Sequence, residues 1–293
     1  MRRSAPSELL IRQRLTALTR ALPAARQGDA ESLHQARVAT RRLRETLPLV
    51  ASGARQKKLD RRVRTLTRAL GPVRELDVAL QILDELSESG DMPRAAVTRL
   101  RQAVRAERQA LHDEMLRRVE GVDVEKLRKR ALAAARKTAL KARSAGPAGD
   151  VAARTRAVRR AEALRAAIES AAALYLPDRL HDVRIAVKKL RYALEVSGTM
   201  SRSRAQGRLR TLKKAQDLLG RMHDLEVLIA RTRGVQGSRR APSLELSGDL
   251  DRIVRHLENE CRQLHAHYIT LRKTLLDVCD QVMATRTRRA AAA

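Results

Sequence analysis

The sequence contains almost no aromatic side chains. Its 293 residues include no tryptophan and no phenylalanine, and the tyrosines are Tyr175, Tyr192 and Tyr268. Proteins that read single-stranded nucleic acid usually stack the bases on aromatic rings. The composition therefore argues against folds of that class.

Cysteines and long apolar runs are also scarce. The two cysteines, Cys261 and Cys279, fall on one predicted helix, whose straight geometry separates them by about 27 Å and prevents a disulfide between them. They are interpreted as reduced thiols of a cytoplasmic protein. No apolar run is long enough to span a membrane, and residues 1–15 lack the apolar stretch of a signal peptide. We therefore expect a cytoplasmic protein without membrane contact.

Acidic residues are too few to balance the basic ones. Lys and Arg total 62, Asp and Glu total 33, and the net charge is +29. A disordered polycation is disfavoured because 43% of the residues are apolar and recur with a strong period. An excess charge of this size destabilises a compact fold through self-repulsion, so we expect a polyanionic partner.

Helical periodicity is the dominant pattern. Apolar residues recur at steps of three and four, and no alternating β-branched run of strand length occurs. The breakers Gly146, Pro147 and Gly149 lie in a predicted linker at 142–152. The pattern predicts an all-α fold with helices at 7–22, 29–52, 55–70, 73–88, 93–119, 124–143, 150–175, 178–199, 203–219, 221–233 and 245–285. We expect two halves, 1–145 and 146–293, within one domain that covers about 7–285.

The last predicted helix carries an unbroken heptad pattern about 50 Å long. Its apolar seam consists of Leu250, Val254, Leu257, Cys261, Leu264, Tyr268, Leu271, Leu275, Val278 and Val282. Such a seam suits the wall of a helical bundle. The alternative is that it joins two copies of the chain, which would make the protein a homodimer.

Two stretches of the chain occur twice. HQARVATRRLR at 34–44 returns as HDVRIAVKKLR at 181–191, and LGPVRELDV at 70–78 returns as LGRMHDLEV at 219–227. In the second pair, each glycine is predicted to end a helix with a positive φ. The repeats predict an internal duplication, with two pseudo-symmetric antiparallel helical bundles that face each other.

Each copy of the first motif forms a basic stripe on a helix. At 100° per residue, the four basic positions of each copy fall within an arc of about 80°. Like charges one turn apart repel, so the stripes are costly unless an anion lies along them. Arginine forks bind phosphate oxygens, lysine adds a point charge, and histidine adds a donor. The stripes are His34, Arg37, Arg41 and Arg44, and His181, Arg184, Lys188 and Arg191. We expect a phosphate chain between them.

These paired motifs resemble the CHAD family, the conserved histidine α-helical domain. The resemblance covers nearly the whole chain: each copy reads His-x-x-Arg-x-x-x-basic-basic-Leu-Arg and is followed by Leu-Gly and an acidic-Leu-acidic-Val stretch. The resemblance implies two helical bundles around a basic central groove or pore, binding of inorganic polyphosphate, and association with polyphosphate granules. It implies a site lined by His34, Arg37, Arg41, Arg42, Arg44, His181, Arg184, Lys188, Lys189 and Arg191. Further candidates, which rest on the internal alignment, are Arg61, Arg64, Arg210 and Lys213.

An enzymatic site is not expected. A metal-dependent phosphohydrolase needs clustered carboxylates or His–Asp pairs to hold its metals. Within the repeated stretches, only His181-Asp182 and His223-Asp224 form such pairs, and the arginines around the motif histidines would repel a cation. We therefore expect no catalytic residue, no metal and no cofactor.

Two other functions remain open. A protein this basic should bind duplex DNA or RNA weakly and non-specifically at low salt. A recessed pore would admit a thin phosphate chain and exclude a duplex, whereas a convex patch would do the reverse. The other function is a scaffold role, in which the last helix docks a partner.

Overall fold

The computed structural model describes residues 6–145, 148–201, 206–238 and 242–290, and the secondary structure in these ranges is nine α-helices without a strand. The all-α prediction is confirmed. The helices are α1 (Pro6–Arg26), α2 (Ala30–Val50), α3 (Gly53–Ser89), α4 (Arg94–Glu120), α5 (Val124–Ala145), α6 (Ala148–Ala171), α7 (Pro177–Ser201), α8 (Gln206–Gln236) and α9 (Leu244–Ala290).

Local sequence explains where the first motif helix begins. Asp29 is the N-cap of α2, and its carboxylate accepts a 2.7 Å hydrogen bond from the backbone N–H of Ser32. This bond satisfies one of the N–H groups that a helix start leaves free. Gly28, directly before it, has a φ of 91°, which a glycine adopts at little cost. The chain therefore turns sharply between α1 and α2, and the motif begins at His34, one turn into α2.

The expectation that Gly71 and Gly220 end helices is wrong. Gly71 lies inside α3, Gly220 lies inside α8, and neither has a positive φ. A glycine in a helix interior costs only about 1 kcal/mol relative to alanine. On α3, Leu70 and Val73 are both fully buried on either side of the glycine, so continuous apolar burial outweighs that cost. Each pair of helices that was expected around a glycine is therefore one long helix.

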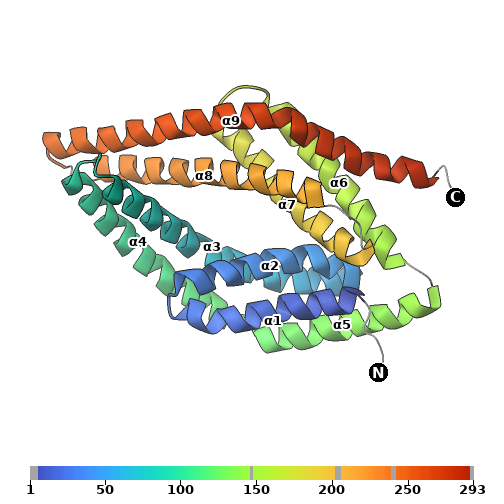
Figure 1. Ribbon diagram of the computed structural model, residues 1–293. Helices are drawn as coiled ribbons and strands as arrows, with labels where there is room; N and C mark the ends of the chain where they lie inside the picture. Colours follow the sequence, from blue (N-terminus) through green and yellow to red (C-terminus); the bar gives the residue numbers. More distant parts are fainter. Residues whose placement is uncertain (1–5, 146–147, 202–205, 239–241, 291–293) are drawn as a thin grey trace.

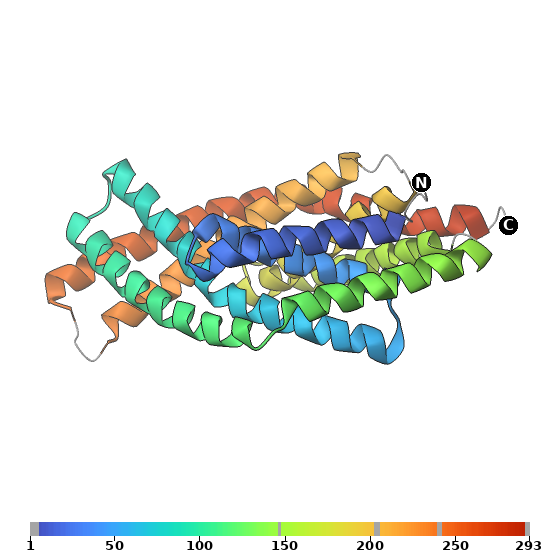
Figure 2. The same cartoon turned by 90° about the horizontal axis from the view of Figure 1, so that it is seen from below.

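The two halves pack in the same order. In the first half α1 contacts α2, α2 contacts α3, and α3 contacts α4; in the second half α6 contacts α7, α7 contacts α8, and α8 contacts α9. The first-half helices form one layer and the second-half helices another (Figure 1), and in the view from below α1 and α5 of the first layer lie in front (Figure 2). The predicted linker at 142–152 is shorter than expected, because α5 reaches Ala145 and α6 begins at Ala148. The boundary at 145/146 and the duplication stay predictions.

The hydrophobic core consists of three buried clusters. One lies mainly among α1, α2, α5 and the first part of α3, and a second lies among α6, α7, α8 and the C-terminal part of α9. The third joins both halves, with Leu76 of α3 and Leu100 of α4 packed with Leu225 of α8 and Leu257 of α9. The four helices that carry this shared core, α3, α4, α8 and α9, come together at one end of the molecule (Figure 1). It fixes α3 beside α8, and thereby the motif helices α2 and α7 against each other.

The apolar seam of α9 packs inside the chain. Leu250 and Leu257 belong to the shared core, whereas Tyr268 and Leu275 belong to the second-half core. The predicted bundle wall is therefore confirmed, and the seam is not free to pair with a second copy. The possible homodimer itself stays a prediction. No helix in the described part of the chain has the length and apolar character needed to cross a membrane.

Candidate anion-binding site

The two motif helices meet across a cavity of about 370 Å³. Its walls come from α2 and α3 of the first half and from α7 and α8 of the second. Five of the predicted site residues line it, and they come from both copies of the motif: His34, Arg37, Arg41, Arg184 and Lys188. Arg37 and Arg184 occupy matched positions of the two copies, as do Arg41 and Lys188.

The cations in this cavity are desolvated and repel one another. Burial, followed by the nearby charges of Arg41 and Arg184, lowers the pKa of Arg37 to about 9. Burial, followed by the same two arginines and Arg37, lowers the pKa of Lys188 to about 6. The guanidinium Nε atoms of Arg37 and Arg184 are buried and have no hydrogen-bond partner among the described residues. A buried donor without a partner is costly, so the cavity is suited to an anion that supplies the missing acceptors.

Carboxylates in the cavity do not neutralise this cluster. Oδ1 of Asp224 lies 3.7 Å from Nη2 of Arg184, and burial raises the pKa of Asp224 although Arg184 and Lys188 oppose that shift. Glu75 is drawn to Arg231, whose Nη2 lies 3.2 Å from Oε1 of Glu75. The local charge therefore remains positive.

The predicted histidines are placed differently from each other. His34 lines the cavity, whereas His181 lies beside the cavity residue His223, with 3.3 Å between their Nδ1 atoms. In that pair one nitrogen must donate and the other accept, which requires at least one neutral ring. Burial is the main cause that lowers the pKa of both rings, and for His223 the value is about 3. His223 is therefore neutral at physiological pH.

Two predicted site residues, Arg42 and Arg191, instead contact Glu195 and Tyr192 of α7. Nε of Arg42 on α2 lies 3.4 Å from Oε2 of Glu195 on α7, and Nη1 of Arg191 lies 2.6 Å from the other oxygen of Glu195. Both guanidinium groups lie over the ring of Tyr192, at 5.9 and 4.7 Å from its centre. Arg191 also donates a 2.9 Å hydrogen bond to Gln216. These arginines are not among the residues that line the cavity.

The other candidates outside the cavity have acidic partners or lie on the surface. Arg44 and Arg64 share Asp60, at 3.2 and 2.8 Å. Lys213 lies 2.7 Å from Asp217. Arg61 and Arg210 are exposed.

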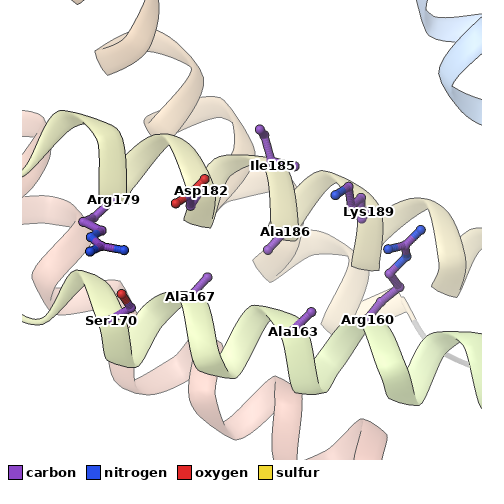
Figure 3. A pocket seen from close by; sticks show the side chains of 9 residues that line it. All are labelled: Arg160, Ala163, Ala167, Ser170, Arg179, Asp182, Ile185, Ala186 and Lys189. Carbon is purple, nitrogen blue, oxygen red and sulfur yellow. The ribbon is translucent and has the colours of Figure 1, made fainter. Parts of the chain in front are cut away.

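Lys189 faces a different hollow from its neighbour Lys188. It lines an outer groove of about 320 Å³ between α6 and α7, together with Arg160, Arg179 and Asp182 (Figure 3). The two consecutive lysines of the second motif, about 100° apart around α7, therefore face two different hollows.

Sequence reasoning missed a matched set of cavity residues on α3 and α8. Arg74 and Glu75 occupy the positions in 70–78 that His223 and Asp224 occupy in 219–227, and all four line the cavity. The signal was present in the repeat itself. Because the stretch was interpreted as a glycine turn, its polar residues were not assigned to the site. Within the described residues, no group of three His, Cys, Asp or Glu side chains is arranged to hold a metal ion.

Comparisons with known proteins agree with this architecture. The family model of the CHAD domain matches residues 9–233. The CHAD domain from the plant Ricinus communis has 22% sequence identity and a TM-score of 0.65, with 90% of this chain and 92% of that chain covered. PptA from Streptomyces chartreusis has 17% identity and a TM-score of 0.62, with 94% and 98% covered. No curated protein matches. The chain belongs to the CHAD domain family.

Proposed function

We propose that the chain binds inorganic polyphosphate in the cavity between α2 and α7. The observation that carries this proposal is a set of half-buried basic side chains, Arg37, Arg41, Arg184 and Lys188, which line one cavity from both halves. Phosphate oxygens are suited to such a cluster, because arginine forks donate in pairs and each phosphate brings a negative charge. The family resemblance implies the same ligand.

The shape of the site favours a thin polyanion over a nucleic-acid duplex. These basic side chains lie within a recess bounded by four helices, and they are half-buried. A duplex carries its phosphates on the outside of a broad cylinder and binds basic surfaces that it can approach from one side. The exposed cations of the molecule would then account for weak nucleic-acid binding at low salt.

The direct test is binding of fluorescently labelled long-chain polyphosphate near physiological salt. We expect the double variant Arg37→Gln/Arg184→Gln to bind about 100-fold more weakly, because two charge-assisted contacts are lost. Arg105→Gln/Arg255→Gln removes the same charge from exposed positions and should weaken binding by less than about threefold. Circular dichroism checks that both variants remain helical. Equal losses in both variants would refute the cavity as the site.

Duplex DNA as competitor separates the two candidate ligands. If polyphosphate occupies the recess, an excess of duplex measured in phosphate units should leave most of the labelled chain bound at physiological salt. Full displacement by equal phosphate would indicate a general polycation instead.

We infer further that binding is not followed by cleavage. The expectation is that long-chain polyphosphate keeps its length on a gel after prolonged incubation with the protein and Mg²⁺.

We also propose, from the proposed ligand, that the protein is located in the cytoplasm at polyphosphate granules. A fluorescent fusion should gather at granules, and the Arg37→Gln/Arg184→Gln variant should not.

A further inference from the structure

Asp224 places a carboxylate inside the cavity that gathers the cations. It lies on α8 and lines the cavity together with Arg184 and Lys188 of α7. Its side chain is 26% exposed, and that of Arg184 is 12% exposed. The one ion pair of Asp224 with a described residue is the 3.7 Å contact with Arg184. That distance is too long for a hydrogen bond, so the pair is electrostatic and loose.

The matched residue of the first half behaves differently. Glu75 lines the same cavity, but Nη2 of Arg231 lies 3.2 Å from its carboxylate, and Arg231 also lies 3.1 Å from Glu107. Arg231 is not among the residues that line the cavity. The charge of Glu75 is thus balanced by an arginine outside the cavity lining, whereas the charge of Asp224 faces Arg184, an arginine of the site.

A phosphate that enters the cavity must compete with this carboxylate. Both are oxyanions, and both need the same guanidinium donors of Arg184. Burial penalises the ionised form of Asp224 and raises its pKa. The attraction of Arg184 and Lys188 therefore offsets only part of the cost of burying this carboxylate. Once a polyphosphate lies beside it, Asp224 adds repulsion inside a partly desolvated space.

We propose that Asp224 is the internal counter-ion of the site, which occupies Arg184 in the free protein and limits the affinity for polyphosphate. The proposal rests on the proposed function and deepens it: one named carboxylate sets how tightly the phosphate chain is held. It also gives a role to a carboxylate that faces the basic residues of the cavity.

The test compares two asparagine variants in the same polyphosphate binding assay. Asp224→Asn should lower the Kd about tenfold, which is the size of one charge-assisted contact that no longer has a competitor. Asp182→Asn is the matched control, because Asp182 of α7 faces the outer groove between α6 and α7 (Figure 3). It makes the same change in net charge close to the site and should lower the Kd by less than about twofold.

A second comparison, in a protein that lacks Arg184, tests whether Asp224 acts on polyphosphate affinity through that arginine. In an Arg184→Gln protein, measured at lower salt to restore measurable binding, Asp224→Asn should gain less than about threefold, because the contested guanidinium is gone. If the asparagine variant does not fold, Asp224→Ser removes the same charge and takes its place in both backgrounds.

The outcomes are separable. Equal gains from Asp224→Asn and Asp182→Asn would overturn the counter-ion role and leave polyphosphate binding intact. Weaker binding by Asp224→Asn would also overturn it, because the carboxylate would then contribute to binding, for example by accepting a hydrogen bond from a protonated terminal phosphate. Absence of polyphosphate binding by the unaltered protein would instead refute the proposed function.

Discussion

Glu45 of α2 and Arg156 of α6 form an ion pair between the two halves of the molecule. Nε of Arg156 donates a 2.8 Å hydrogen bond to one carboxylate oxygen of Glu45, and Arg160 donates a 3.0 Å bond to the other. Glu45 directly follows the first basic motif, and its side chain is only 8% exposed. The residue after the motif therefore ties α2, one wall of the cavity, to the opposite layer.

Loss of this carboxylate should destabilise the protein. Glu45→Gln leaves two arginines facing a neutral amide, and removal of one partner of a buried pair costs about 3–5 kcal/mol. Because both arginines are about a quarter exposed, we expect a smaller loss of about 2 kcal/mol in the free energy of unfolding. Urea unfolding followed by circular dichroism measures it. Glu169→Gln, which breaks an exposed pair with Arg165, should cost less than about 0.5 kcal/mol. Equal costs would show that the Glu45 pair is solvent-screened.

The exposed candidates Arg61 and Arg210 should contribute little to polyphosphate binding. Both lie outside the cavity lining and are solvated. Arg61→Gln/Arg210→Gln should therefore raise the Kd by less than about threefold, through the general loss of charge. The slope of log Kd against log salt should fall only slightly. A loss as large as that of Arg37→Gln/Arg184→Gln would mean that the bound chain extends over the outer faces of α3 and α8.

Lys188 should make the stability of the protein depend on pH. Burial and then Arg184, Arg41 and Arg37 lower its pKa from 10.5 to about 6, while Asp224 opposes the shift. Between these two values the unfolded chain holds a proton on Lys188 that the folded chain does not, so folded stability falls as pH falls from 10.5 towards 6. Lys188→Met removes this penalty. We expect it to raise the Tm by about 5 °C near pH 6, with a smaller gain near pH 9.

The neighbouring lysine provides the control for that measurement. Lys189 is exposed and faces the outer groove, so Lys189→Met should change the Tm by less than about 2 °C across the same pH range. A gain for Lys188→Met that is the same at every pH would assign the effect to apolar packing and not to the charge.

Helical periodicity predicted the central residues of the cavity but not the complete set of residues that line it. The helical arc correctly placed Arg37, Arg41, Arg184 and Lys188 on faces that meet, because burial of the opposite apolar face fixes the rotation of each helix. It could not separate the cations that face the cavity from Arg44 and Arg191, which share the same arcs but lie outside the cavity lining. That distinction depends on where their partners Asp60 and Glu195 lie in space.

The same limit explains the error at the glycines. Sequence rules treat Gly71 followed by Pro72 as a helix end, since both residues weaken a helix locally. The flanking Leu70 and Val73 are buried by tertiary contacts that a single chain does not reveal. Tertiary packing therefore overrode local preference, and the polar residues one turn later entered the cavity.

Binding of polyphosphate should be accompanied by proton uptake at Lys188. In the free protein at pH 7 its amine is mostly neutral, because its pKa is about 6 among three arginines. A phosphate chain in the cavity replaces repulsion with attraction and raises that pKa, so the amine takes up about one proton on binding. Titration calorimetry in buffers with different ionisation enthalpies measures the number of protons.

Lys188→Arg is the matched variant for this measurement, because arginine keeps a positive charge in the free protein as well as in the complex. It should take up about one proton fewer than the unaltered protein, while His34 and His181 contribute equally to both and cancel in the comparison. Lys189→Arg should leave the number of protons unchanged, since that lysine faces the outer groove. An equal number of protons for Lys188→Arg and the unaltered protein would place the uptake on another group and contradict a neutral Lys188 in the free cavity.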